Sequence, residues 1–174
     1  MANGPFDPET GELIPRAPER KDLVELCRDL HQRSAKFMVV GGFAIILAGY
    51  PRTTGYIDIL IDTDLENEAR VYEALATLPD GCVRELEVSE VEKYTAVRVA
   101  DEILVNLMAK ASGIDYQEAS QSLVIHELDG LPIPFASPEL LWRMKCLAGR
   151  EKDRGEIEFL RQYFAAKGIQ PPAL

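Results

Sequence analysis

One acidic side chain lies inside a strictly alternating run of the chain, and it is the first candidate for chemistry. Asp58 stands between isoleucines in the run 56–62. Successive side chains of a β-strand point to opposite faces, so one face of this run is apolar and the other carries acids. The apolar face holds Ile57, Ile59 and Ile61, and the other holds Tyr56, Asp58, Leu60 and Asp62. The run predicts a strand that presents Asp58 to a ligand or a cation; the alternative is a strand acid at a solvated edge.

Two glycines earlier in the chain indicate a place where an anion can approach the backbone. Gly41 and Gly42 follow the apolar run 37–40 and precede apolar residues at helical spacing, which predicts a strand, a glycine turn and a helix. Glycine lets a ligand come close to the backbone, and the free N–H groups that open a helix favour an anion such as phosphate. An ordinary tight turn is the alternative, because glycine most often marks turns.

Polar side chains in two further places suit the same chemistry. Arg52 and Thr54 supply a guanidinium and a hydroxyl, groups that bind phosphate oxygens, although both also suit a surface turn. Asn106 lies among apolar residues of the predicted strand 103–108, and a buried amide without partners costs roughly 1–3 kcal/mol. Asn106 is therefore either a hydrogen-bonded core residue or a contact to a metal or a ribose.

The order of these features resembles a known family. The chain is similar to the nucleotidyltransferase-fold (DNA polymerase beta-like) superfamily, and within it to small bacterial proteins akin to abortive-infection nucleotidyltransferase toxins. The resemblance covers most of residues 37–160. It rests on Gly41-Gly42 with the following helix, on Gly49 and Arg52 before Thr54, on the acidic strand, on the run 103–108, and on the run 140–160 with Lys145, Arg150, Lys152 and Asp153.

The resemblance implies transfer of a nucleoside monophosphate from a nucleotide triphosphate to an acceptor hydroxyl, with magnesium ions clamping the attacking and leaving oxygens. In the family pattern three acids hold the metal, and the corresponding positions here read Tyr56, Asp58 and Asn106. The resemblance thus makes Asp58 the catalytic residue and makes Asp58 and Asn106 the metal-binding positions. It places the triphosphate against Gly41, Gly42, Arg52, Thr54, Tyr56 and Lys145.

Because two of the three acids are replaced, a second interpretation stays open. An asparagine carbonyl is a weaker ligand for magnesium than a carboxylate, and a phenol with a pKa of about 10 stays protonated. The chain is either a nucleotidyltransferase or a catalytically silent relative that senses a nucleotide or binds a protein; a plain scaffold is the third reading. Tyr56 either stacks on a nucleobase or fills space. Lys145 either binds the triphosphate or packs its aliphatic stem on the apolar stripe and extends its charge into water.

Composition limits the partners. Among 174 residues, 19 are Lys or Arg and 29 are Asp or Glu, which gives a net charge of −10. This balance repels a polyanion and excludes bulk nucleic-acid binding, although a local cluster can still hold one nucleotide or the end of a transfer RNA. The sequence is compatible with a protein or a transfer RNA as the acceptor, and with a partner protein that completes or neutralises the site. The chain contains no run of 18 apolar residues and no charged-then-apolar leader, which predicts a cytoplasmic protein without membrane contact.

The remaining pattern predicts an α+β fold, with a mixed or antiparallel sheet flanked by helices and a C-terminal helical annex. Residues 1–20 are predicted as a disordered tail, 21–136 as the core and 137–170 as the annex packed on it. Three widely spaced cysteines indicate neither a disulfide framework nor a zinc site.

Individual elements follow from periodicity and from capping residues. Helices are predicted at 20–34 and 64–78, the second with Thr63 and Glu66 as a capping box, and strands at 83–88, 95–99 and 103–108, the last two as a hairpin. Asp129-Gly130 predicts a hairpin turn between the runs 123–128 and 131–135, and Pro132 with Pro134 demotes the second run to an edge strand or less. Ser137 and Pro138 predict the start of a helix that ends at Gly149.

Overall fold

The structure is a computed structural model that describes residues 7–12 and 14–174. The predicted tail 1–20 therefore lies in part outside the described residues. Near its end, Arg16 is attached to the rest of the molecule: its guanidinium lies 2.7 Å from Asp22 Oδ1 and 3.0 Å from Glu102 Oε1. The backbone N–H of Arg16 also donates to the carbonyl of Glu102 at 2.9 Å.

Six strands form one mixed sheet in the order β3-β4-β2-β1-β8-β7. They are β1 (Phe37–Val40), β2 (Tyr56–Ile61), β3 (Ala96–Ala100), β4 (Leu104–Met108), β7 (Leu123–Leu128) and β8 (Leu131–Ala136); β5 (Lys110–Ala111) and β6 (Ile114–Asp115) form a separate ribbon. β2 pairs in parallel with β4, and β1 in parallel with β8, whereas the other neighbours are antiparallel. This mixed sheet with its flanking helices confirms the predicted α+β fold.

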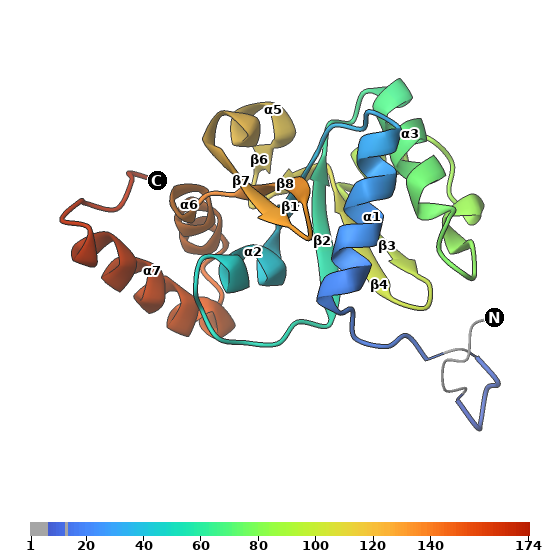
Figure 1. The fold of residues 1–174 in the computed structure, drawn as a ribbon, viewed down its shortest axis with the longest axis horizontal. Helices are drawn as coiled ribbons and strands as arrows, with labels where there is room; N and C mark the ends of the chain where they lie inside the picture. Colours follow the sequence, from blue (N-terminus) through green and yellow to red (C-terminus); the bar gives the residue numbers. More distant parts are fainter. Residues whose placement is uncertain (1–6, 13) are drawn as a thin grey trace.

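Helices cover both faces of the sheet. The longer ones are α1 (Arg20–Gln32), α2 (Gly41–Leu47), α3 (Leu65–Leu75), α6 (Pro138–Ala148) and α7 (Arg154–Ala166); α4 (Glu90–Tyr94), α5 (Tyr116–Ala119) and the 3₁₀ turns η1 (Cys82–Glu85), η2 (Ser120–Ser122) and η3 (Glu151–Asp153) are short. Figure 1 shows α1 and α3 together on one side of the sheet and α2 and α6 on the other, with α7 beyond α6. Within the described residues, no helix is both long enough and apolar enough to cross a membrane.

The core follows from the alternation in β2 and from the apolar stripe of α1. Ile57, Ile59 and Ile61 are each fully buried, as the period of two predicts. Leu23 and Leu30 lie two turns apart on the same face of α1, and both are likewise fully buried. Burial of these side chains holds β2 in the register that turns its other face toward α2.

The predicted strand at 83–88 is wrong. The chain forms the 3₁₀ turn η1 there and then the short helix α4. The buried carboxylate of Asp101 accepts hydrogen bonds from the backbone N–H groups of Asp80 at 2.9 Å and Cys82 at 3.1 Å, which bends the segment into a turn. Because Asp101 lies about twenty residues away along the chain, the local sequence pattern of residues 83–88 does not indicate this contact.

The prediction that prolines push residues 131–135 to an edge is also wrong, because β8 lies inside the sheet between β1 and β7. Pro132 and Pro134 lie opposite Glu127 and Ile125 of β7, while β8 pairs with β1 only at Phe135, beyond both prolines. A proline lacks one backbone donor, so an internal strand tolerates it where the neighbouring ladder does not need that donor.

Helix α3 begins one residue later than the predicted capping box. The N-cap is Asp64, whose carboxylate accepts hydrogen bonds from the backbone N–H groups of Glu66 at 3.1 Å and Asn67 at 3.4 Å. Thr63 makes none of the capping bonds of α3.

We predict that Asp64→Ala lowers the free energy of unfolding by about 1 kcal/mol, because two helix N–H groups lose their acceptor. Urea denaturation followed by circular dichroism measures the change. Thr63→Ala is the matched control and should leave the midpoint nearly unchanged. A larger loss in Thr63→Ala than in Asp64→Ala would show that the cap is assigned to the wrong residue.

Candidate functional site

The end of β1 and the middle of β2 meet at Asp58. Val40 pairs with Asp58 across the antiparallel ladder, and Gly41 follows directly with a left-handed φ of +64°. A Cβ at Gly41 would overlap Asp58 Oδ2 and would lie 2.9 Å from its Cγ. Glycine is therefore required here twice, by the backbone conformation and by the close approach of the carboxylate.

Gly42 serves a second close contact. A Cβ at Gly42 would lie 2.5 Å from Thr54 Oγ1 and 2.6 Å from Thr54 Cβ. The Thr54 hydroxyl in turn donates to the backbone carbonyl of Tyr56 at 3.1 Å. The predicted glycine turn is thus the surface against which the loop before β2 packs, and it brings Thr54 and Asp58 to the first turn of α2.

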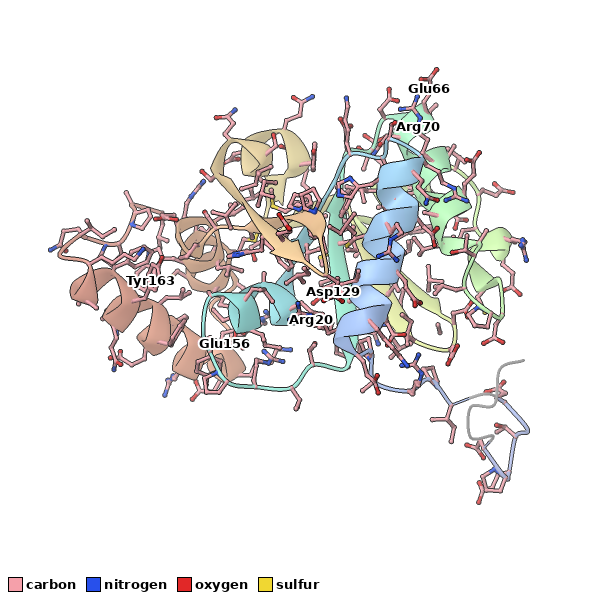
Figure 2. The ribbon with its side chains drawn as sticks, in the orientation of Figure 1. Arg20, Glu66, Arg70, Asp129, Glu156 and Tyr163 are labelled. Carbon is pink, nitrogen blue, oxygen red and sulfur yellow. The ribbon has the colours of Figure 1, made fainter. Side chains whose placement is uncertain are left out.

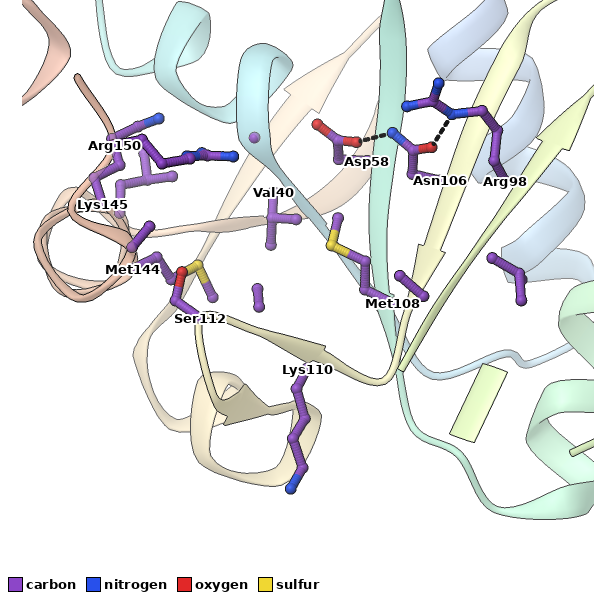
Figure 3. A pocket seen from close by; sticks show the side chains of 16 residues that line it. Val40, Asp58, Arg98, Asn106, Met108, Lys110, Ser112, Met144, Lys145 and Arg150 are labelled. Carbon is purple, nitrogen blue, oxygen red and sulfur yellow. Dashed lines mark hydrogen bonds between the residues drawn. The ribbon is translucent and has the colours of Figure 1, made fainter. Parts of the chain in front are cut away.

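A chain of hydrogen bonds runs across three strands from Asp58 (Figure 3). Asn106 is the direct partner of Asp58 in the parallel ladder of β2 and β4, and Arg98 is its partner in β3. Asn106 Nδ2 donates to Asp58 Oδ1 at 2.7 Å, and Arg98 Nε donates to Asn106 Oδ1 at 2.9 Å. The chemistry determines the orientation of the amide, since a flipped amide would face its NH₂ to a guanidinium and its oxygen to a carboxylate.

Arg98 also covers Tyr56. Its guanidinium lies 4.6 Å from the centre of the Tyr56 ring, a cation–π contact on a side chain that remains 39% exposed. Sequence reasoning did not single out Arg98. Its position in an alternating strand was visible, but its approach to both Tyr56 and Asn106 depends on the strand order.

These side chains do not suit magnesium as they stand. Asn106 can offer a metal only its carbonyl oxygen, and that oxygen accepts from Arg98. Asp58 Oδ1 accepts from Asn106, which leaves Oδ2, the oxygen that faces Gly41, as the one free carboxylate oxygen of these three side chains. Among residues 7–12 and 14–174, no three His, Cys, Asp or Glu side chains are grouped so that they could share a metal ion.

The C-terminal helices bring a buried ion cluster to the same region. Lys145 of α6 is 6% exposed, and its Nζ pairs with Glu156 Oε2 and lies 3.5 Å from Asp153 Oδ1. Glu156 Oε1 pairs with Arg52, and Arg150 Nε lies 2.6 Å from Asp153 Oδ2. Arg52 and Lys145 were predicted as phosphate contacts; both are held by one glutamate, Glu156, which sequence reasoning did not identify.

Two adjoining cavities join these groups into one cleft, with volumes of about 480 and 350 Å³. Gly41, Asp58, Lys145 and Arg150 line both. Asn106 lines the first, and Gly42, Arg52, Thr54 and Tyr56 line the second. The structure therefore brings all eight predicted site residues to one cleft, while their roles stay predictions.

The cleft is cationic in an acidic protein. Three carboxylates line it, Asp58, Asp153 and Glu156, against six cations, Arg52, Arg98, Lys110, Lys145, Arg150 and Lys152. Lys110 points away from Asp58 in Figure 3, which leaves five cations around the centre. A third cavity, between α1 and the turn after α3, has the opposite balance, with two cations and four carboxylates. In a chain of net charge −10, this excess of positive charge makes the cleft a candidate site for an anion.

No family model and no curated protein matches this chain. Among solved structures, a "putative nucleotidyltransferase" from Thermotoga maritima is similar to it, with 17% sequence identity, 86% of this chain and 97% of that chain covered, and a TM-score of 0.49.

The cluster around Asp153 makes a pH-dependent contribution to stability. Burial by itself raises the pKa of this carboxyl, but the hydrogen bond from Arg150 and the charge of Lys145 outweigh it and leave the pKa below its ordinary value. The folded state therefore favours the charged carboxylate. The resulting stability is complete above the ordinary pKa of 3.8 and is lost as the pH falls through the lower pKa of the folded state.

We predict that Asp153→Asn costs about 1.5–3 kcal/mol at pH 7, the value of hydrogen bonds to charged groups, and clearly less at pH 3. Urea denaturation at both pH values measures the difference. Asp129→Asn is the matched control, because Asp129 forms an exposed pair with Arg20 at 3.1 Å (Figure 2) and should cost little at either pH. An equal cost of Asp153→Asn at both pH values would contradict the assignment.

Proposed function

We propose that the cleft binds the phosphates of a nucleoside triphosphate, and that the natural chain holds this nucleotide without transferring its nucleoside monophosphate. The observation that supports binding is the concentration of cations at one cleft of an acidic chain. Arginine and lysine are the side chains that proteins use for phosphate oxygens. Five of them around one cleft suit a polyphosphate better than a single phosphate.

The shape of the cleft supports a nucleotide over an inorganic anion. Both cavities fall within the range of small-molecule sites, about 300–1,000 Å³. The second cavity contains Arg52, Thr54 and the glycine turn, whereas the first has apolar walls formed by Val40, Val97, Met108, Leu141 and Met144. A ligand with a charged part and a flat apolar part matches this division.

The chain of hydrogen bonds from Asp58 to Arg98 supports a silent site over an active one. Metal-assisted phosphoryl transfer needs cations that clamp the attacking and leaving oxygens, and carboxylates hold those cations. Here the third acid position, Asn106, is an amide whose oxygen accepts from Arg98, and the first, Tyr56, is a phenol under the same guanidinium. Arg98 supplies positive charge at this place from the protein itself.

Nucleotidyl transfer is the second candidate, because one oxygen of Asp58 still faces the glycine turn at the wall shared by both cavities. In this reading Asp58 is the catalytic residue and, with Asn106, the metal-binding position. The resemblance implies an acceptor hydroxyl, and in this second candidate a protein or a transfer RNA supplies it.

Calorimetric titration with each of the four ribonucleoside triphosphates, with magnesium and again with a chelator, tests the first proposal. We expect binding under both conditions, and at least about a tenfold loss in Arg150→Ala, since one charge-assisted contact to phosphate is worth about 1.4 kcal/mol or more. Arg154→Ala is the matched control, because Arg154 is an exposed arginine outside both cavities. No binding of any of the four would refute the proposal, and binding that requires magnesium would favour the enzyme.

The double variant Tyr56→Asp with Asn106→Asp separates the two candidates. With the four triphosphates and magnesium, we expect transfer of a labelled nucleoside monophosphate to a protein or transfer RNA hydroxyl, with release of pyrophosphate, only in the double variant, because it restores the charge that holds the metal. Adding Asp58→Asn to that variant should abolish the signal. Transfer by the unmodified chain that disappears in Asp58→Ala would instead establish the enzyme.

A further inference from the structure

We infer that Glu156 is an intramolecular competitor for phosphate: its carboxylate occupies the position between Arg52 and Lys145 that a phosphate group takes when a nucleotide binds. The inference deepens the proposed function and rests on it, since it concerns the same cleft. Its basis is the way in which one carboxylate engages two cations from separate elements.

The geometry of this contact is that of a bound anion. Glu156 Oε1 pairs with Arg52, from the loop between α2 and β2, and Glu156 Oε2 pairs with Lys145 on α6. Each oxygen thus takes one cation, as two oxygens of a phosphate would. Gly41, Gly42 and Thr54 line the same cavity, so the carboxylate lies where the backbone is open to a ligand.

Burial distinguishes this contact from an ordinary surface pair. The side chains of Glu156 and Lys145 are 5% and 7% exposed, whereas that of Arg52 is 38% exposed. The cluster thus has one open side, at the guanidinium, from which an anion can enter. A phosphate carries about −1.5 to −2 charges and three acceptor oxygens, so it outcompetes a single carboxylate that regains hydration on leaving.

The helix that carries Glu156 is held in place, so the displacement concerns the side chain. Glu156 lies in the first turn of α7 (Figure 2). A Cβ at Gly155 would lie 2.7 Å from the Tyr50 hydroxyl, and the rings of Tyr50 and Phe159 are 5.4 Å apart. These contacts pack the first turn of α7 against Tyr50, which leaves a change of rotamer as the way for Glu156 to release its cations.

The test uses Glu156→Gln, which keeps the shape of the side chain and removes its charge. The probe is inorganic tripolyphosphate, titrated by calorimetry into the full chain, with ATP in parallel. We expect tripolyphosphate to bind at least about tenfold more tightly to Glu156→Gln than to the natural chain, because Arg52 then has no carboxylate partner among the described residues and Lys145 keeps only Asp153. Glu151→Gln removes one exposed carboxylate of η3 outside both cavities, and should change the affinity less than about twofold.

A second background separates competition from a general effect of charge. If Glu156 competes at Arg52, adding Glu156→Gln to a chain that already carries Arg52→Ala should raise the affinity for tripolyphosphate by less than about threefold. A general charge effect predicts that Glu156→Gln raises the affinity equally in the natural chain and in Arg52→Ala. That result would overturn the inference. Thermal unfolding confirms that each variant is folded, and Glu156→Asp, too short to bridge both cations, should give an intermediate gain if Glu156→Gln does not fold.

The outcomes also separate this inference from the proposed function. Binding of ATP by the natural chain with no gain in Glu156→Gln refutes the competitor and leaves the nucleotide site. A gain that depends on Arg52, without binding of any of the four ribonucleoside triphosphates by the natural chain, supports the competitor and refutes the proposed function. Absence of binding in every variant refutes both.

Discussion

The contact between Gly41 and the carboxylate of Asp58 is the constraint on which the cleft depends. It requires a residue without a Cβ, in a left-handed conformation, at the point where β1 becomes α2. Because β1 and β2 pair in antiparallel register, this point lies beside the polar face of β2. The start of α2, the loop that carries Thr54 and the side chain of Asn106 all take their positions relative to this contact.

The buried ion cluster joins the C-terminal helices to the sheet through the same cleft. Glu156 connects α7 to α6 through Lys145, and to the loop before β2 through Arg52. Removing charges from water is costly, and a buried cluster is kept only when each member has partners. The cluster therefore adds little to the stability of the fold. It instead favours one arrangement of α6, α7 and the loop, since it forms only when all three are in place.

The charge distribution is the property of the cleft on which the choice between the proposed functions rests. The family that the sequence resembles places three acids at the positions of Tyr56, Asp58 and Asn106, where they attract metal ions. Here two acids are replaced, and Arg98 lies over the ring of Tyr56 and against the amide of Asn106. The positive charge of Arg98 at these positions supports the proposed anion site over a metal site.

Local patterns determined the elements: the alternation of 56–62, the glycine turn, and the helices at 20–34 and after Ser137 were read from residues that are neighbours along the chain. The eight candidate site residues followed from the same patterns together with the family resemblance. Only the tertiary structure decided that β8 is internal despite its prolines, that Asp101 bends residues 82–85 into a turn, and that Glu156 and Arg98 engage the candidate residues. The physical reason is common to these cases. Each depends on a hydrogen bond, an ion pair or a strand pairing between segments far apart in the chain, and period and composition carry no information about such partners.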